Sequence, residues 1–280
     1  MVHFVHRLKQ ITGRTVARMT WLPGASTGEV WHITLDNGRQ IVVKPCTNPA
    51  LEAAQRTYLA RKSSLPLPAI IAELKTFLIL EYVPHIGKLE RKGELHAADL
   101  IASLHTIHAD HYGFASDTMI GTIKQQGGWH DTWSDFLIQK RLMMAARLAY
   151  HKAGIDHATL MRLNRLKEKV PDLTPAQHQP SLLHGDLWAG NILGNGDHVA
   201  AFIDPAISYG EPEFELAYAT FFHSFSQHFF DRYHEHHPAL DGFDDTRKPI
   251  YQLYPLLLHA ALYRGDYGRI AGRILRYFVG

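Results

Sequence analysis

The sequence predicts an α+β protein with two lobes, a small β-rich lobe over residues 1–83 and a larger, mostly helical lobe over residues 84–280. Two observations carry this prediction. Runs of β-branched and aromatic residues alternate with turn signals in the first third of the chain, and from about residue 85 the apolar residues recur at helical spacing. A chain of 280 residues, 46% of them hydrophobic, is long enough to bury a core without disulfides.

A β-hairpin is expected in the first lobe. The runs Val30–Leu35 and Gln40–Lys44 are rich in β-branched residues, and the pair Asn37-Gly38 lies between them. Asn-Gly is a strong hairpin signal, because a tight two-residue turn needs positive φ angles that these residues tolerate. We therefore expect positive φ at both positions.

A helix and a further strand follow the hairpin. Asn48 is suited to cap a helix and Pro49 to occupy its first turn, so a helix is predicted over 49–62. The apolar run 77–82 is predicted as a strand, and the hinge between the lobes is expected near 82–86.

The second lobe is predicted to be mainly helical. One helix face is marked by Leu100, Ile101, Leu104 and Ile107. Further helices are expected within 133–152, 213–237 and 250–278. A short β-like section interrupts them at 182–204, and residues 112–132 are predicted as a long loop, a feature that is usually functional or disordered.

Charge and cysteine content exclude several classes of protein. With 29 Lys and Arg against 27 Asp and Glu, the net charge of +2 gives no reason to expect nucleic acid or anionic lipid as a partner. The only cysteine, Cys46, excludes intrachain disulfides and favours a reducing compartment. No run of about 18 apolar residues is present, so no membrane span is expected. The N-terminus lacks the apolar core of a signal peptide, and we expect a soluble, cytoplasmic protein.

The clearest chemical signature lies between residues 182 and 204. Asp186 and Asn191 are five apart across a glycine-containing loop, and Asn191 opens a second predicted hairpin that ends at Asp204. Because antiparallel pairing places the first residues of a hairpin opposite the last, the three side chains are expected to meet. Their oxygens suit a hard cation, and a carboxylate left off the metal can accept a proton. The alternative is that these residues only stabilise a turn and a strand end.

This stretch resembles the catalytic loop of the protein-kinase-like superfamily. Protein kinases carry His-Arg-Asp-x-x-x-x-Asn followed by Asp-Phe-Gly. The corresponding residues here are His184-Gly185-Asp186 with Asn191, and Asp204-Pro205-Ala206. Gly185 and Pro205 replace an arginine and a phenylalanine that serve phosphorylation-switched protein kinases. The resemblance therefore favours the small-molecule branch, which includes aminoglycoside, choline and homoserine kinases.

A narrower resemblance is to the fructosamine-3-kinase family. The run Leu182–Asn191 carries Trp188 where protein kinases usually have lysine, and this is similar to the family's hallmark. Further similar segments are 121–129 with Trp133, Tyr209-Gly210, 213–217 and 251–254. The resemblance implies a protein-kinase-like fold, with a nucleotide-binding N-lobe over 1–83 and a catalytic, substrate-binding C-lobe over 84–280.

The resemblance also implies roles for individual residues. Asp186 would accept or orient the proton of a substrate hydroxyl, and Asn191 and Asp204 would hold Mg²⁺ on the phosphates of ATP. Lys44 is expected to reach the phosphates with Glu52 orienting it. Taken alone, Lys44 would instead be a solvated residue at a strand end, and Glu52 would be an acidic residue that interacts with the dipole at a helix N-terminus.

The remaining nucleotide contacts are expected in the hinge and in a glycine-containing loop. Glu81 and Val83 should offer backbone groups to adenine. The segment 24–28 should cover the phosphates, with Ser26 and Thr27 as contacts, although it has fewer glycines than a Gly-x-Gly-x-x-Gly loop.

The implied acceptor is the 3-hydroxyl of a ketosamine, such as a fructosamine or ribulosamine, either free or on a glycated protein. Trp188 is expected to pack against sugar C–H groups or, alternatively, to prop the catalytic loop. Trp129 is expected to contact the substrate from the 112–132 loop. The alternatives are a kinase for another hydroxyl substrate, of the aminoglycoside, choline or homoserine type, and a non-catalytic nucleotide-binding module. The oligomeric state is left open.

The 20 histidines allow a metal site, but a structural role is favoured. His105, His108 and His111 are three apart, and a second group spans 234–237. Zinc binding is conceivable at such spacings, yet His105 belongs to a predicted structural helix and the second group to a helix end. His184 is expected to hydrogen-bond the backbone and hold the catalytic loop.

Overall fold

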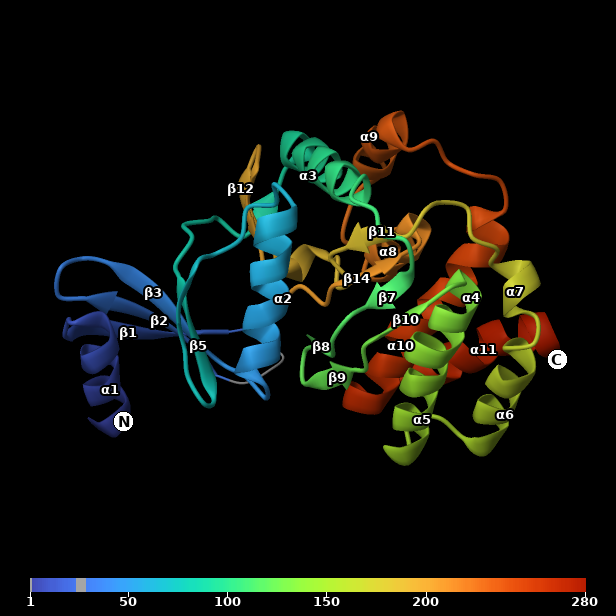
Figure 1. Cartoon of the computed structure of the whole chain (residues 1–280), viewed down its shortest axis with the longest axis horizontal. Coiled ribbons are helices and arrows are strands. Elements are labelled where there is room, and N and C mark those ends of the chain that lie inside the picture. Colours follow the sequence, from blue (N-terminus) through green and yellow to red (C-terminus); the bar gives the residue numbers. More distant parts are fainter. Residues whose placement is uncertain (1, 24–28) are drawn as a thin grey trace.

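The computed structural model describes residues 2–23 and 29–280, and shows a sheet-containing lobe beside a larger helical lobe (Figure 1). The N-lobe consists of α1 Val2–Thr12, β1 Val16–Leu22, β2 Val30–Leu35, β3 Gln40–Pro45, α2 Pro49–Lys62, β4 Ile70–Glu73 and β5 Phe77–Glu81. The strands of the C-lobe are β6 Lys88–Leu89, β7 Tyr112–Phe114, β8 Thr118–Ile120, β9 Ile123–Gln125, β10 Gly128–His130, β11 Ser181–Leu183, β12 Ile192–Gly196, β13 Val199–Phe202 and β14 Ser208–Gly210.

Helices make up most of the C-lobe. They are α3 Arg91–His105, α4 Trp133–Phe136, α5 Met143–His151, α6 His157–Leu166, α7 Val170–Leu173, α8 Pro212–Phe221, α9 Gln227–His236, α10 Lys248–Tyr263 and α11 Tyr267–Val279. Two π-helical segments, Leu137–Leu142 and Phe243–Arg247, continue into α5 and α10. None of the helices described is long and apolar enough to cross a membrane.

The N-lobe sheet has the strand order β1-β2-β3-β5-β4, with antiparallel neighbours throughout. The hairpin between β2 and β3 is confirmed, but the expected turn geometry is wrong. Only Gly38, with φ 81°, has a positive φ, and Asn37 does not. The Gly38 N–H donates to Leu35 O, and the Leu35 N–H donates to Arg39 O. This is the longer hairpin loop in which one left-handed residue follows a type I turn.

Helices cover both faces of this sheet. The predicted helix over 49–62 is confirmed as α2, and the Asn48 side chain accepts a hydrogen bond from the Leu51 N–H at 3.2 Å. Ala53 of α2 packs against Leu80 of the sheet. On the opposite face lies α1, which was not expected within a lobe interpreted mainly as strands. Its Phe4, Leu8 and Ile11 recur at helical spacing and pack on the sheet.

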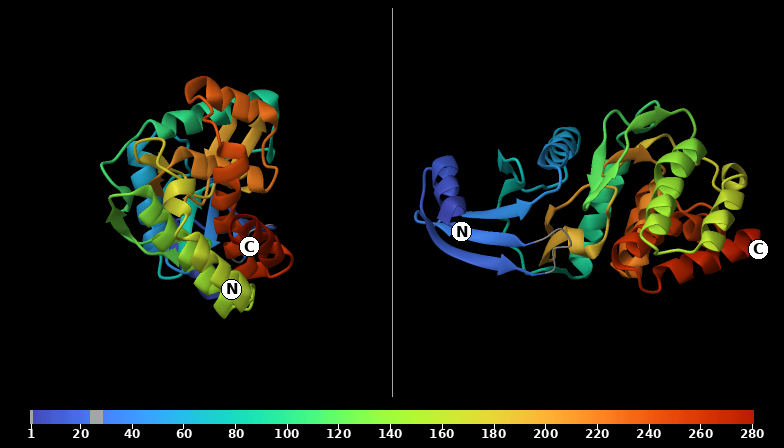
Figure 2. Two further views of the ribbon diagram at one scale, coloured as in Figure 1. Left: turned by 90° about the vertical axis from the view of Figure 1, so that its right-hand side faces the viewer. Right: turned by 90° about the horizontal axis from the view of Figure 1, so that it is seen from below.

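The C-lobe core surrounds α10, whose apolar residues are buried against α5, α8 and α11. Figure 2 shows these helices on the side of the molecule away from the N-lobe sheet. The helical stretches expected at 133–152, 213–237 and 250–278 are confirmed. The long loop expected at 112–132 is wrong, because this segment forms β7 to β10. β7 and β10 extend a sheet with β14 and β11, and three-residue strands are too short to show a period.

Candidate active site

The loop that carries Asp186 follows β11 directly. Between His184 and Asp186 the chain passes through Gly185, whose φ is 84°. A Cβ on Gly185 would lie 2.0 Å from the Ala206 carbonyl oxygen, so neither the backbone angle nor the space accepts another residue. The Ala206 N–H in turn donates to His184 O at 2.7 Å. This close packing of two loops places Asp186 and Asp204 near each other.

Asp186 and Asn191 are in direct contact. The Asn191 Nδ2 donates to the Asp186 carboxylate Oδ2 at 2.7 Å and to its backbone carbonyl at 2.8 Å. Burial raises the pKa of Asp186 to about 6, although the hydroxyl of Tyr218 and the amide of Asn191 act in the opposite direction. Asp186 therefore has the environment of a weakly basic carboxylate that can take up a proton near neutral pH.

Asp204 completes the group from the other strand of the hairpin. β12 and β13 pair as expected, and the Ile203 N–H donates to Asn191 O at 2.9 Å. Asp204 has φ 51°, a left-handed value that is costly for residues other than glycine and that recurs at active sites. The three predicted residues, Asp186, Asn191 and Asp204, therefore do come together.

An ion-pair cluster joins this group to the N-lobe. The Lys44 Nζ lies 2.8 Å from Glu52 Oε2, which is the predicted pair, and 2.7 Å from Asp204 Oδ1. Burial alone would lower the pKa of Lys44, but the carboxylates of Asp204 and Glu52 raise it above its ordinary value. Lys44 thus remains a cation between the two lobes.

The donor set suits a hard divalent cation. Asp204 offers a carboxylate, and the carbonyl oxygen of the Asn191 side chain is left to accept, since its amino group points to Asp186. Within residues 2–23 and 29–280, no three His, Cys, Asp or Glu side chains gather as a metal site. A cation here would take its remaining ligands from phosphate and water, which is the usual way that Mg²⁺ binds.

Glu215 holds the loop that carries Asp186, and our sequence interpretation gave it no role. Its buried carboxylate accepts from the backbone N–H groups of both His184 and Gly185, and from His105 Nε2 at 2.9 Å. His184 Nδ1 accepts from the Asp186 N–H at 3.4 Å, so the expected backbone contact of His184 is present. The signal that was available was a glutamate inside an otherwise apolar run, Phe214–Ala217.

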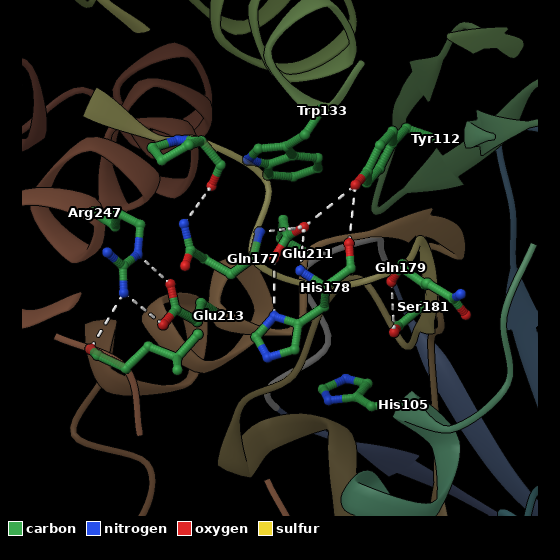
Figure 3. Close-up of polar contacts among 12 residues, drawn as sticks. His105, Tyr112, Trp133, Gln177, His178, Gln179, Ser181, Glu211, Glu213 and Arg247 are labelled. Atoms are coloured by element: carbon green, nitrogen blue, oxygen red, sulfur yellow. Dashed lines mark hydrogen bonds and ion pairs between the residues drawn. The ribbon is translucent and has the colours of Figure 1, made fainter. Parts of the chain in front are cut away.

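A second buried network supports the start of α8 (Figure 3). Glu211 accepts from the N–H groups of Gln177 and His178, at 3.2 Å each, and from the Tyr112 hydroxyl at 3.3 Å. Glu213 pairs with Arg247. These glutamates fix α8, the helix from which Glu215 and Tyr218 reach the loop that carries Asp186.

The two tryptophans that are predicted to contact the acceptor substrate lie in different surroundings. Trp188 is half-buried, its ring centroid is 5.1 Å from that of Phe222, and a Cβ on Gly190 would lie 2.2 Å from its ring. Trp188 therefore packs against Phe222 and against Gly190 of its own loop. Its contact with a sugar and its support of the loop both stay predictions. Trp129 is 45% exposed and packs near Phe114 and Tyr209. Its described contacts do not bring it to Asp186, and it lies on a strand, β10, instead of a loop.

The expected nucleotide contacts are only partly described. Glu81 ends β5, paired with Ile41, and Val83 follows it in the hinge. The Val83 carbonyl accepts from His85 Nδ1 at 2.9 Å. Backbone contacts of Glu81 and Val83 with adenine stay a prediction, and Ser26 and Thr27 lie outside the described residues.

Three histidines of the two groups singled out in the sequence have structural partners. His105 is fully buried between Tyr233, at 2.7 Å, and Glu215. In the C-terminal group, His236 Nε2 lies 2.8 Å from Asp99 and His237 Nε2 lies 3.0 Å from Ala102 O. These contacts attach the end of α9 to α3.

Comparisons with known proteins show the family to which this chain belongs. Residues 5–279 match the profile of the fructosamine kinase family. The chain belongs to the fructosamine kinase family. A probable ketoamine kinase of Enterococcus faecium is 34% identical to it over 203 residues, which is 72% of this chain and 72% of that protein.

Solved structures confirm the predicted protein-kinase-like α+β fold of this fructosamine kinase family member. A crystal structure of a candidate fructosamine-3-kinase from Haemophilus somnus has a TM-score of 0.85 at 25% identity, covering 99% of this chain and 97% of that chain. An aminoglycoside phosphotransferase variant, solved without ligand, has a TM-score of 0.70 at 17% identity, covering 99% of each chain.

Proposed function

We propose that this fructosamine kinase family member transfers the γ-phosphate of ATP to a hydroxyl of a ketosamine. The observation that carries the proposal is the meeting of Asp186, Asn191, Asp204 and Lys44 between the lobes. Two further findings support it: the family match, and a related aminoglycoside phosphotransferase that has been solved with ADP and hygromycin B.

The chain's own residues can carry out this transfer with little covalent chemistry. Asp186 would accept the proton of the attacking hydroxyl, and Asn191 holds its carboxylate in place. Lys44, oriented by Glu52, would bind the phosphates. Asn191 and Asp204 would hold Mg²⁺, which neutralises phosphate charge when bound. Positioning and charge neutralisation are the main sources of rate enhancement in phosphoryl transfer.

The acceptor is best tested by identifying the product. The protein is incubated with ATP, Mg²⁺ and a synthetic fructosamine, and the phosphate is located by NMR. We expect phosphorylation of the sugar 3-hydroxyl, and a ribulosamine and a glycated peptide are assayed beside it to separate free from protein-bound substrates. Phosphate on an amino alcohol or an aminoglycoside only, in a panel measured by ADP release, would remove the ketosamine assignment. Binding of Mg-ATP without ADP release with any acceptor would indicate a non-catalytic module.

The raised pKa of Asp186 predicts a pH-dependent rate. Because a general base must be ionised, protonation of Asp186 removes activity, and kcat/KM is expected to fall about tenfold for each pH unit below about 6. Above this value the rate should level off. The profile is measured from about pH 5 to about pH 8 at constant ionic strength, with nucleotide affinity determined at each pH. A rate that does not change across this range would exclude Asp186 as the base.

A further inference from the structure

Helix α2 presents an unusual row of buried polar side chains to the C-lobe. Glu52, Gln55 and Arg56 lie three and four residues apart, hence on one face of the helix, and each is less than 10% exposed. Buried charges and amides destabilise a protein unless they are paired, so a face of this kind indicates specific partners. Glu52 has its partner in Lys44. Gln55 and Arg56 have no part in the phosphate-binding roles described above.

The Gln55 amide connects α2 to two segments of the C-lobe. Its Nε2 donates to the carbonyl of Pro205, the residue after Asp204, and to Met119 O at 3.2 Å. Its Oε1 accepts from the Met119 N–H at 2.9 Å. One side chain thus holds both the segment that follows Asp204 and strand β8.

Arg56 acts on the Asp204 side chain itself. Its Nη2 lies 3.6 Å from Asp204 Oδ1, the same oxygen that accepts from Lys44. Its Nε and Nη1 are buried and have no hydrogen-bond partner in the described part of the chain. Two cations, Lys44 and Arg56, therefore balance the two carboxylates of Glu52 and Asp204 across the lobe boundary.

The contacts of Gln55 and Arg56 surround a residue whose backbone conformation is strained, Asp204. A non-glycine residue at φ 51° is strained, and such strain persists only where the surrounding structure maintains it. Gln55 holds the carbonyl of the next residue and Arg56 holds the Asp204 carboxylate. Both contacts come from α2, so they also fix this helix against the C-lobe.

We propose that Gln55 and Arg56 are positioning residues that hold the Asp204-Pro205 segment in its strained, binding-ready conformation before any ligand arrives. This inference rests on the proposed function, because it takes Asp204 as the residue that receives the cation. The lobes would then be assembled without phosphorylation of a loop and without a ligand-driven shift of α2. Gly185 and Pro205 stand where phosphorylation-switched protein kinases have an arginine and a phenylalanine. Their presence is consistent with a site that is not switched.

The test compares Gln55→Leu, Arg56→Met and Arg56→Lys with wild type, and uses Arg61→Met, an exposed position on the same helix, as the control. Hydrogen exchange over residues 203–207 is measured without ligand. ADP binding is measured by calorimetry with and without Mg²⁺, and thermal unfolding is followed for each variant. We expect exchange to rise about tenfold in Arg56→Met and Gln55→Leu, and the Mg²⁺-dependent gain in ADP affinity to fall about tenfold, which is the size of effect expected for the loss of one polar contact.

Arg56→Lys should show smaller changes than Arg56→Met in both exchange and Mg²⁺ dependence. The affinity for ADP without Mg²⁺ should change little in all the variants. Arg56→Met should still unfold cooperatively near the wild-type temperature, because Lys44 continues to neutralise Asp204. Wild-type exchange and wild-type Mg²⁺ dependence in both Gln55→Leu and Arg56→Met would overturn the inference. Failure of the wild type to transfer phosphate, with exchange still raised in the variants, would reject the proposed function and leave the positioning role standing.

Discussion

Replacing Asp186 with asparagine is expected to reduce phosphate transfer by about a thousandfold or more while nucleotide binding is retained. The amide cannot accept the proton of the attacking hydroxyl, but it is close in size to the carboxylate and can still accept from Asn191 Nδ2. The ion pair of Lys44 with Asp204 lies outside this contact, so the nucleotide site should remain intact. The measurement is ADP release with a ketosamine, together with ADP affinity by calorimetry.

Asp197→Asn is the matched control for this prediction. Asp197 is an exposed residue in the turn between β12 and β13, so the same chemical change is made on the same hairpin away from the cluster. The control should have wild-type turnover and stability. Turnover in Asp186→Asn within a few-fold of the wild-type rate would show that Asp186 does not act as the base and would require another acceptor for the proton.

The meeting of Asp186, Asn191 and Asp204 could be predicted because it depends on local order. A five-residue spacing and a short hairpin bring these side chains together within a single stretch of chain, and antiparallel pairing leaves little freedom in how they meet. The Lys44–Glu52 pair could be predicted for a related reason, because the end of a strand and the start of the next helix are close together in the sequence. The contacts of Arg56 and Glu215 are not of this kind. They join positions far apart in the chain, and no local pattern specifies them.

Two elements of the fold were interpreted wrongly, for different reasons. Segment 112–132 was interpreted as a loop because its strands are only three residues long. One of them, β7, pairs with β14, a partner nearly a hundred residues away that no local pattern reveals. The helix α1 was overlooked although Phe4, Leu8 and Ile11 show its period, since the β-rich sequence around it dominated the interpretation. The expected place of Trp129 on a loop was wrong for the same reason as the segment 112–132.

Removal of the Glu215 carboxylate is expected to be the most destabilising single change in the site. Glu215→Ala removes the acceptor of the backbone N–H groups of His184 and Gly185. Among the described residues, it leaves the buried His105 ring with Tyr233 as its remaining hydrogen-bond partner. Breaking a buried pair of this kind costs about 3–5 kcal/mol in the free energy of unfolding. Burial favours the protonated acid, but the hydrogen bond and charge of His105 hold the pKa of Glu215 below its ordinary value. The stabilisation is therefore fully present at neutral pH and is lost only as the pH falls through this lowered value.

Urea unfolding at neutral pH measures this cost, with Glu235→Ala as the control because Glu235 is an exposed glutamate on α9. We expect the control to change the free energy of unfolding by less than about 0.5 kcal/mol. Activity should fall in Glu215→Ala as well, since the loop that carries Asp186 loses two of its backbone hydrogen bonds. A Glu215→Ala variant as stable as the control would mean that the close packing of Gly185 against Ala206, and not the carboxylate, is what holds the catalytic loop.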